Sequence, residues 1–119
     1  MYHPLLLDHF QNPRNAGDLG ERAVAVDVSN PACGDMMRLS ARAVDGRVQE
    51  VRFLTRGCTA SIACGSALTE LVLGRTPAEL KTIRAADVEA AVGELIPESK
   101  HAAVLCVDAA RALARALEV

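Results

Sequence analysis

The chain has 119 residues, half of them apolar, so we expect residues 1–119 to fold as a single domain around one core. With 13 Lys and Arg against 15 Asp and Glu, the formal charge is -2, and this balance gives no electrostatic reason to expect nucleic acid or an anionic membrane as a partner. One Tyr, two Phe and no Trp also leave the chain without the aromatic platforms on which bases stack.

The amino-terminal segment predicts a short helix over residues 4–10, with Leu5, Leu6 and Phe10 facing the core. The turn-forming residues 12–15 end it. This segment lacks the cationic start and long apolar stretch of a secretory signal. No apolar run in the chain approaches the roughly 20 residues of a membrane helix. We therefore expect a cytoplasmic protein without a membrane partner.

Three strands are predicted after this helix, over residues 23–28, 37–44 and 47–54. The last two flank Asp45-Gly46, a pair that favours a tight two-residue hairpin turn. The strands are therefore expected to be antiparallel.

The periodicity becomes helical from Thr59, and a helix of about 14 residues fits before Gly74. Short helices are predicted near Thr76 and Asp87, and residues 98–118 form the longest helical candidate. Strands first and helices afterwards predict an α+β fold, in which helices pack on one face of a three-stranded antiparallel sheet and the carboxyl-terminal helix is long.

Two loops carry candidate ligands. Cys33 and Asp35 follow Pro31 on the loop that enters the second strand, where they can converge on one ion. Cys58 lies between the third strand and the next helix, and the free amide groups at a helix start favour the thiolate. Because the loops lie at the ends of adjacent strands, we expect Cys33 and Cys58 to approach each other. In a reducing compartment such cysteines are ligands or reactive thiols more often than disulfide partners.

The other two cysteines have a simpler interpretation. Cys64 lies inside an Ala-rich helical segment, where core packing is expected. Cys106 lies in the middle of the long helix among apolar residues, so burial is the default there too. His101, just over one helical turn earlier, nevertheless brings another possible ligand into its neighbourhood.

Taken together, the motifs resemble the IscU/NifU N-terminal family of iron-sulfur cluster scaffolds, which includes the zinc-binding SufU branch. The resemblance runs nearly end to end. It rests on Tyr2, Asp8-His9-Phe10, Asn12-Pro13-Arg14-Asn15, Pro31-Ala32-Cys33-Gly34-Asp35, and Gly57-Cys58 with Ser61 and Ile62.

The chain departs from the family pattern at the third ligand element, which is Lys-x-His-Cys. The resemblance aligns His101 with the histidine and Ala102 with the third cysteine. Cys106 lies four residues further, on the same helical face and one turn of about 5.4 Å along the axis. Relocation of the ligand to Cys106 and its simple loss both remain open. Residues 95–99 keep little of the family's chaperone-binding Leu-Pro-Pro-Val-Lys, so the resemblance gives little support to chaperone-assisted transfer.

The resemblance implies a scaffold or carrier and not an enzyme. Such a protein receives sulfur from a cysteine desulfurase, binds iron, assembles a two-iron two-sulfur cluster and passes it to an apo iron-sulfur acceptor protein. The implied ligands are Cys33, Asp35 and Cys58, completed by Cys106 or His101.

The alternatives are a zinc-binding sulfur acceptor that works with the desulfurase, and a metal-free interaction module that kept only the fold. The resemblance also implies that Tyr2 lies near the site or at a contact in a homo-oligomer.

Overall fold

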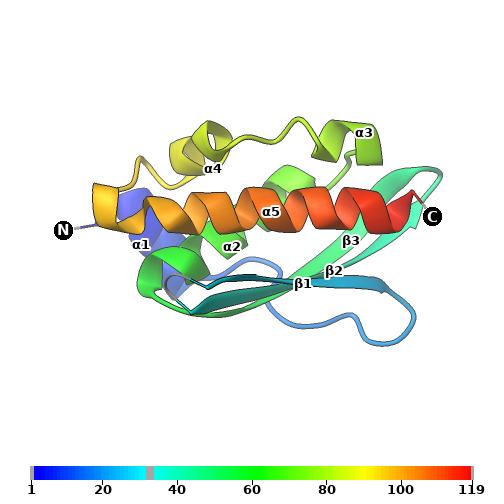
Figure 1. The fold of residues 1–119 in the computed structure, drawn as a ribbon, viewed down its shortest axis with the longest axis horizontal. Helices are drawn as coiled ribbons and strands as arrows, with labels where there is room; N and C mark the ends of the chain where they lie inside the picture. The colour runs from blue at the N-terminus through cyan, green and yellow to red at the C-terminus, as the bar shows by residue number, and fades with distance from the viewer. Residues whose placement is uncertain (1, 32–33, 119) are drawn as a thin grey trace.

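The computed structural model describes residues 2–31 and 34–118 (Figure 1). The elements in chain order are α1 (Pro4–Gln11), β1 (Val24–Asn30), β2 (Asp35–Val44), β3 (Arg47–Arg56), α2 (Thr59–Val72), α3 (Pro77–Leu80), α4 (Ala85–Ala91), a 3-10 turn (Pro97–Ser99) and α5 (Lys100–Leu117). The predicted α+β architecture, with its long carboxyl-terminal helix, is confirmed.

The three strands form one antiparallel sheet in the order β1-β2-β3. Asp45 and Gly46, at φ 54° and 79°, make the predicted hairpin turn between β2 and β3. Both strands run further than predicted, so that Met36 near the start of β2 pairs with Arg56 at the end of β3. The segment that enters β2 and the segment that leaves β3 therefore share one end of the sheet.

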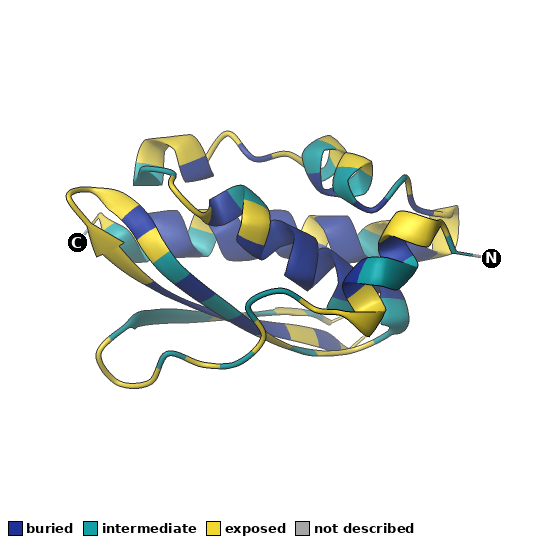
Figure 2. Ribbon diagram, turned by 180° about the vertical axis from the view of Figure 1, so that it is seen from behind, coloured by how far each residue is buried: buried dark blue, intermediate teal, exposed yellow. Residues whose placement is uncertain are grey.

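Helices cover one face of this sheet, as the sequence predicts. α5 packs on β1 and β2, whereas α2 packs on β3 (Figure 1). Figure 2 shows that most of α2 is buried. A Cβ on Gly65 would lie 2.6 Å from a ring carbon of Phe53, so this glycine allows α2 to approach β3 closely.

The orientation of α1 differs from the prediction. Leu6 is buried, but Leu5 and Phe10 are 48% and 37% exposed, and the second buried position is His9. The apolar pattern missed this because α2 presents a polar partner to α1: the Ser66 hydroxyl lies 2.8 Å from His9 Nδ1. The face of α1 that packs on α2 is therefore defined by a hydrogen bond as well as by burial.

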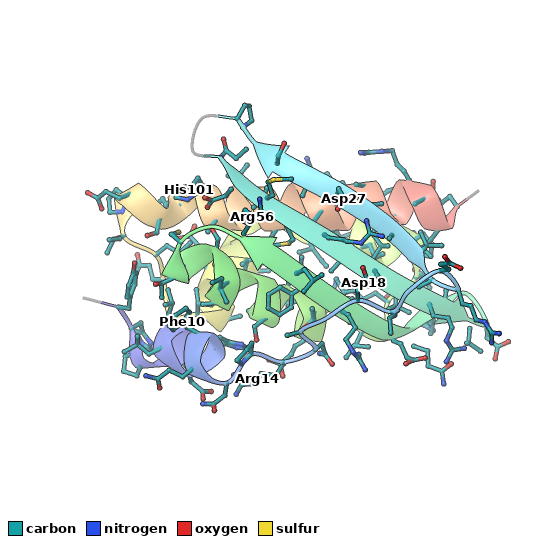
Figure 3. The ribbon with its side chains drawn as sticks, turned by 90° about the horizontal axis from the view of Figure 1, so that it is seen from below. Phe10, Arg14, Asp18, Asp27, Arg56 and His101 are labelled. Carbon is teal, nitrogen blue, oxygen red and sulfur yellow. The ribbon has the colours of Figure 1, made fainter. Side chains whose placement is uncertain are left out.

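The loop between α1 and β1 crosses the face of the sheet opposite the helices. Its backbone pairs with Phe53 at the edge of β3. Further along, Asp18 reaches Arg38 on β2, which also binds Asp27 on β1 (Figure 3). Within the described residues, no helix combines the length and apolar character needed to cross a membrane.

Candidate metal centre

Three chain segments converge at the end of the sheet where β2 begins and β3 ends. Asp35 is the first residue of β2, and Cys58 caps the start of α2, two residues beyond the end of β3. His101 is the second residue of α5. Figure 3 shows His101 at the end of α5 that lies near Arg56, the last residue of β3. Antiparallel pairing and a short β3–α2 connection thus bring together residues far apart in sequence.

One ligand atom from each of Asp35, Cys58 and His101 lies within 4.8 Å of the other two. Cys58 Sγ is 3.9 Å from Asp35 Oδ2 and 3.8 Å from His101 Nε2. His101 Nε2 is 3.1 Å from the same carboxylate oxygen. Ligand bonds of 2.0–2.3 Å in a tetrahedron set separations of about 3.3–3.7 Å between ligand atoms. The three atoms are therefore spaced nearly as they would be around one ion.

The site joins a buried carboxylate to partly exposed ligands. Asp35 is 6% exposed, whereas Cys58 and His101 are each of intermediate exposure. In the part of the chain that the structure describes, the ion-pair partner of Asp35 is His101 alone. Proteins pair or hydrogen-bond a buried carboxylate, or use it to bind a metal, because its desolvation is costly. This environment suits a carboxylate that binds a metal ion at the end of the sheet where β2 begins.

Ser61 and Gly57 also lie next to the Asp35 carboxylate. The Ser61 hydroxyl donates a short hydrogen bond to Asp35 Oδ2 and lies 3.4 Å from Cys58 Sγ. A Cβ on Gly57 would lie 2.6 Å from the carboxylate carbon of Asp35. Sequence reasoning placed both residues in a motif but gave them no role. The signal for Ser61 was its spacing three residues after Cys58, one helical turn away on the same face.

Among the described residues, the candidate cysteines Cys64 and Cys106 are not in this group. Cys33 lies outside the described residues. Cys64 and Cys106 are fully buried, as core packing predicts, and burial raises the pKa of Cys64 to about 12 and that of Cys106 well above its ordinary value. The structure does not bring Cys106 to the group of Asp35, Cys58 and His101. Cys106 lies on the buried face of α5 and belongs to the hydrophobic core.

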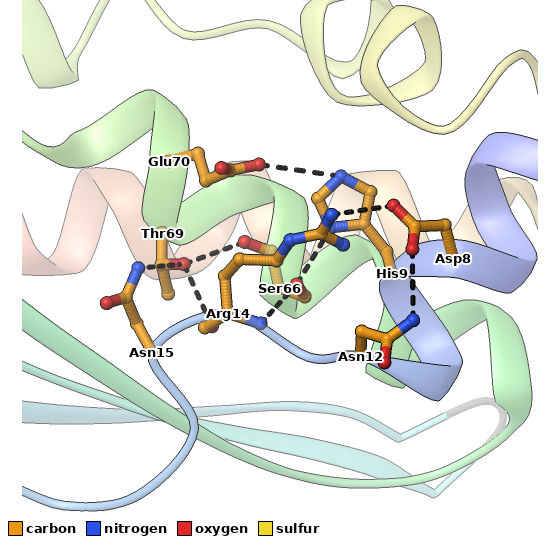
Figure 4. A network of polar contacts seen from close by, with 8 residues as sticks. All are labelled: Asp8, His9, Asn12, Arg14, Asn15, Ser66, Thr69 and Glu70. Carbon is orange, nitrogen blue, oxygen red and sulfur yellow. Dashed lines mark hydrogen bonds and ion pairs between the residues drawn. The ribbon is translucent and has the colours of Figure 1, made fainter.

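The amino-terminal motif fastens α2 at a distance from these ligands (Figure 4). Ser66 Oγ lies 2.8 Å from His9 Nδ1 and accepts a 2.8 Å hydrogen bond from the Arg14 backbone N–H. Asn15 donates a 3.0 Å hydrogen bond to Thr69 Oγ1. These contacts tie α1 and the loop after it to the helix that Cys58 begins.

Fold and site together define an α+β protein in which a thiol, an imidazole and a carboxylate meet at one end of the sheet, a donor set suited to a metal ion. The family model described as "NifU-like N terminal domain" matches residues 1–118. The chain belongs to this family.

Curated relatives agree with this assignment. The chain is 39% identical over 111 residues to "Iron-sulfur cluster assembly scaffold protein IscU 1" of Archaeoglobus fulgidus, covering 93% of this chain and 72% of that protein. It is 40% identical over 116 residues to "Iron sulfur cluster assembly protein 1, mitochondrial" of Eremothecium gossypii, covering 93% and 75%.

A solved structure has the same fold. The N-terminal part of a NifU-like protein from Brucella abortus superposes with a TM-score of 0.63 at 23% identity, covering 95% of this chain and 80% of that one.

Proposed function

We propose that this protein is a scaffold or carrier for iron-sulfur cluster assembly and not an enzyme. The observation that carries the proposal is the convergence of Asp35, Cys58 and His101 on one point at the end of the sheet. Membership of the NifU-like family and the printed names of the relatives support it.

The proposed ligands are Cys33, Asp35, Cys58 and His101. Cys33 completes the set because it precedes Asp35 by two residues. Thiolates bind iron strongly, whereas the harder carboxylate oxygen holds a cluster iron less firmly. A mixed set of this kind suits a two-iron two-sulfur cluster that is assembled and then passed to an apo acceptor protein.

Cys58 is the proposed entry point for sulfur. Its thiol is partly exposed at the start of α2, which gives a partner protein access to the sulfur. In the proposed step the Cys58 thiolate attacks the outer sulfur of a persulfide on a cysteine desulfurase. A new S–S bond forms on Cys58, the persulfide S–S bond breaks, and the desulfurase cysteine leaves as a thiolate.

Anaerobic reconstitution with ferrous iron and sulfide tests the proposal. The wild type should develop visible sulfur-to-iron absorption, and Cys58→Ala should abolish it. Cys64→Ala is the matched control, because its buried thiol lies on the same helix but outside the ligand group, and it should keep the chromophore. A colourless wild type would contradict the proposal.

A second candidate function is a zinc-containing sulfur acceptor. One thiolate, one imidazole and one carboxylate are also a donor set for Zn²⁺. Elemental analysis of protein purified without chelator, combined with a desulfurase activity assay, separates the two candidates. Bound zinc with stimulation of the desulfurase, and no chromophore on reconstitution, would favour this second function.

A further inference from the structure

We propose that Ser61 is a positioning residue that aims the Asp35 carboxylate at the metal before the metal binds. The inference rests on the proposed function, because it assigns a role within the same metal centre. It adds a residue that is not itself a ligand and predicts what that residue does to metal affinity.

The Ser61 hydroxyl contacts two members of the ligand group, Asp35 and Cys58. Its side chain is fully buried in the first turn of α2, three residues after Cys58. Its hydroxyl donates to Asp35 Oδ2, the same oxygen that lies 3.1 Å from His101 Nε2 and 3.9 Å from Cys58 Sγ. One serine therefore contacts the carboxylate oxygen at the centre of the ligand group.

The Ser61 hydroxyl can donate its single proton to only one of the two neighbouring ligands, Asp35 or Cys58. A serine hydroxyl has one proton to donate, and a carboxylate can only accept. Because that proton goes to Asp35, the hydroxyl has none left for the Cys58 sulfur 3.4 Å away and can only accept from a protonated thiol. We infer that Ser61 acts on the carboxylate and not on the thiolate.

Gly57 completes the arrangement from another side. With hydrogen in place of a side chain, it lets the Asp35 carboxylate pack against the backbone where a Cβ would collide with it. Held by Ser61 and backed by Gly57, the carboxylate directs Oδ2 toward Cys58 and His101. Partners that orient a metal ligand in this way typically raise metal affinity, and their loss costs 10–100-fold.

Cobalt titration of the apo protein under anaerobic conditions tests the assignment. Ser61→Ala should weaken Co²⁺ binding by about 10-fold, with the sulfur-to-cobalt absorption at saturation unchanged because the Cys58 thiolate remains. In an Asp35→Ala background the same change should cost less than about twofold, since the group that Ser61 positions is gone.

Three controls separate positioning from folding. Ser40→Ala removes another buried, hydrogen-bonded hydroxyl, which lies on β2 and outside the ligand group, and should leave Co²⁺ affinity unchanged. Ser61→Thr keeps a hydroxyl and should bind Co²⁺ more tightly than Ser61→Ala. The rate of Cys58 alkylation in the apo protein should be the same in Ser61→Ala and the wild type.

Equal Co²⁺ affinity of Ser61→Ala and the wild type would overturn the inference. An undiminished loss in the Asp35→Ala background, weaker binding by Ser61→Thr than by Ser61→Ala, or a changed rate of Cys58 alkylation would overturn it as well. A wild type that binds neither Co²⁺ nor iron would instead refute the proposed function, and the role of Ser61 with it.

Discussion

At the scale of single residues, the centre depends on a carboxylate that the fold buries at a strand end. Asp35 is 6% exposed, yet the basic side chain that contacts it within the described residues is a histidine and not an arginine or lysine. A fixed cation there would neutralise the carboxylate permanently. With His101 and a serine hydroxyl around it instead, the carboxylate keeps its capacity to bind an incoming metal ion.

Gly57→Ala should weaken metal binding because its Cβ would lie within 2.9 Å of three atoms of the Asp35 carboxylate. We expect Co²⁺ affinity to fall by about 10-fold as the carboxylate moves away. Gly74→Ala is the control: no atom lies near its added Cβ, but its φ is 84°, so it should lower the free energy of unfolding without changing Co²⁺ affinity. Equal affinities for Gly57→Ala and wild type would contradict the steric argument.

Cysteine labelling should distinguish Cys58 from the two buried thiols. At pH 8 in the native apo protein, iodoacetamide should modify Cys58 rapidly. Cys64 and Cys106 should react only after unfolding, because burial excludes the reagent and raises their pKa values, to about 12 for Cys64. Mass spectrometry of digested peptides gives the order of modification. If Cys106 in the native protein were labelled as fast as Cys58, its thiol would be accessible and could again be considered a ligand.

Cys106→Ala should therefore leave Co²⁺ affinity unchanged while lowering the free energy of unfolding by about 1–2 kcal/mol, the usual cost of trimming a core side chain. Titration with Co²⁺ and denaturation with urea measure the two effects separately. A large loss of affinity with little loss of stability would show that Cys106 belongs to the metal centre.

At the scale of secondary-structure elements, the position of Cys58 depends on how α2 is held. The amino-terminal motif contacts α2 at Ser66 and Thr69, two to three turns beyond Cys58. Asp8 pairs with Arg14 at 2.6 Å and closes the motif on itself. These polar contacts add to the apolar packing that holds α2 against β3.

Acid should destabilise this contact through His9. Burial and the nearby Arg14 lower the His9 pKa below its ordinary 6.5, while Glu70 and Asp8 oppose the shift. Because the unfolded chain then takes up a proton at a higher pH than the folded one, the stabilisation is present above pH 6.5 and is lost as the pH falls below it.

Urea denaturation between pH 7.5 and 5 should accordingly show a falling free energy of unfolding. The slope should be shallower in His9→Gln, which has no titrating group at this position. Equal slopes in the two proteins would show that His9 does not set the pH dependence.

The sequence predicted most elements because each carries a local signal. Asp45-Gly46 marks the hairpin, and Gly74 follows α2. The inward face of α1 was missed, since pairing His9 with Ser66 depends on a residue 57 positions away. Strand order alone predicts that Asp35 and Cys58 are neighbours. The roles of Ser61 and Gly57 depend on their distances to the Asp35 carboxylate, which the sequence does not contain.

At the scale of the whole molecule, the ligand group joins the start of β2, the start of α2 and the start of α5. An ion bound there links elements that pack through the common core. Metal binding should therefore stabilise the folded state as a whole.

Zinc at about 100 times its dissociation constant should add about 2.7 kcal/mol to the free energy of unfolding and raise Tm by roughly 10 °C. Differential scanning fluorimetry with zinc, and then with excess chelator, measures the rise and its reversal. Asp35→Ala should show a smaller rise. A Tm that responds to neither zinc nor chelator would indicate the metal-free interaction module.

The ligand atoms also come from widely separated parts of the chain. Asp35 and Cys58 are 23 positions apart, and His101 lies another 43 beyond Cys58. During synthesis, then, a ribosome that has made Asp35 and Cys58 has still to make α2, α3 and α4 before it reaches His101. A nascent chain that ends before His101 lacks one of the three ligands, so iron and sulfur delivered to such a chain would meet an incomplete centre.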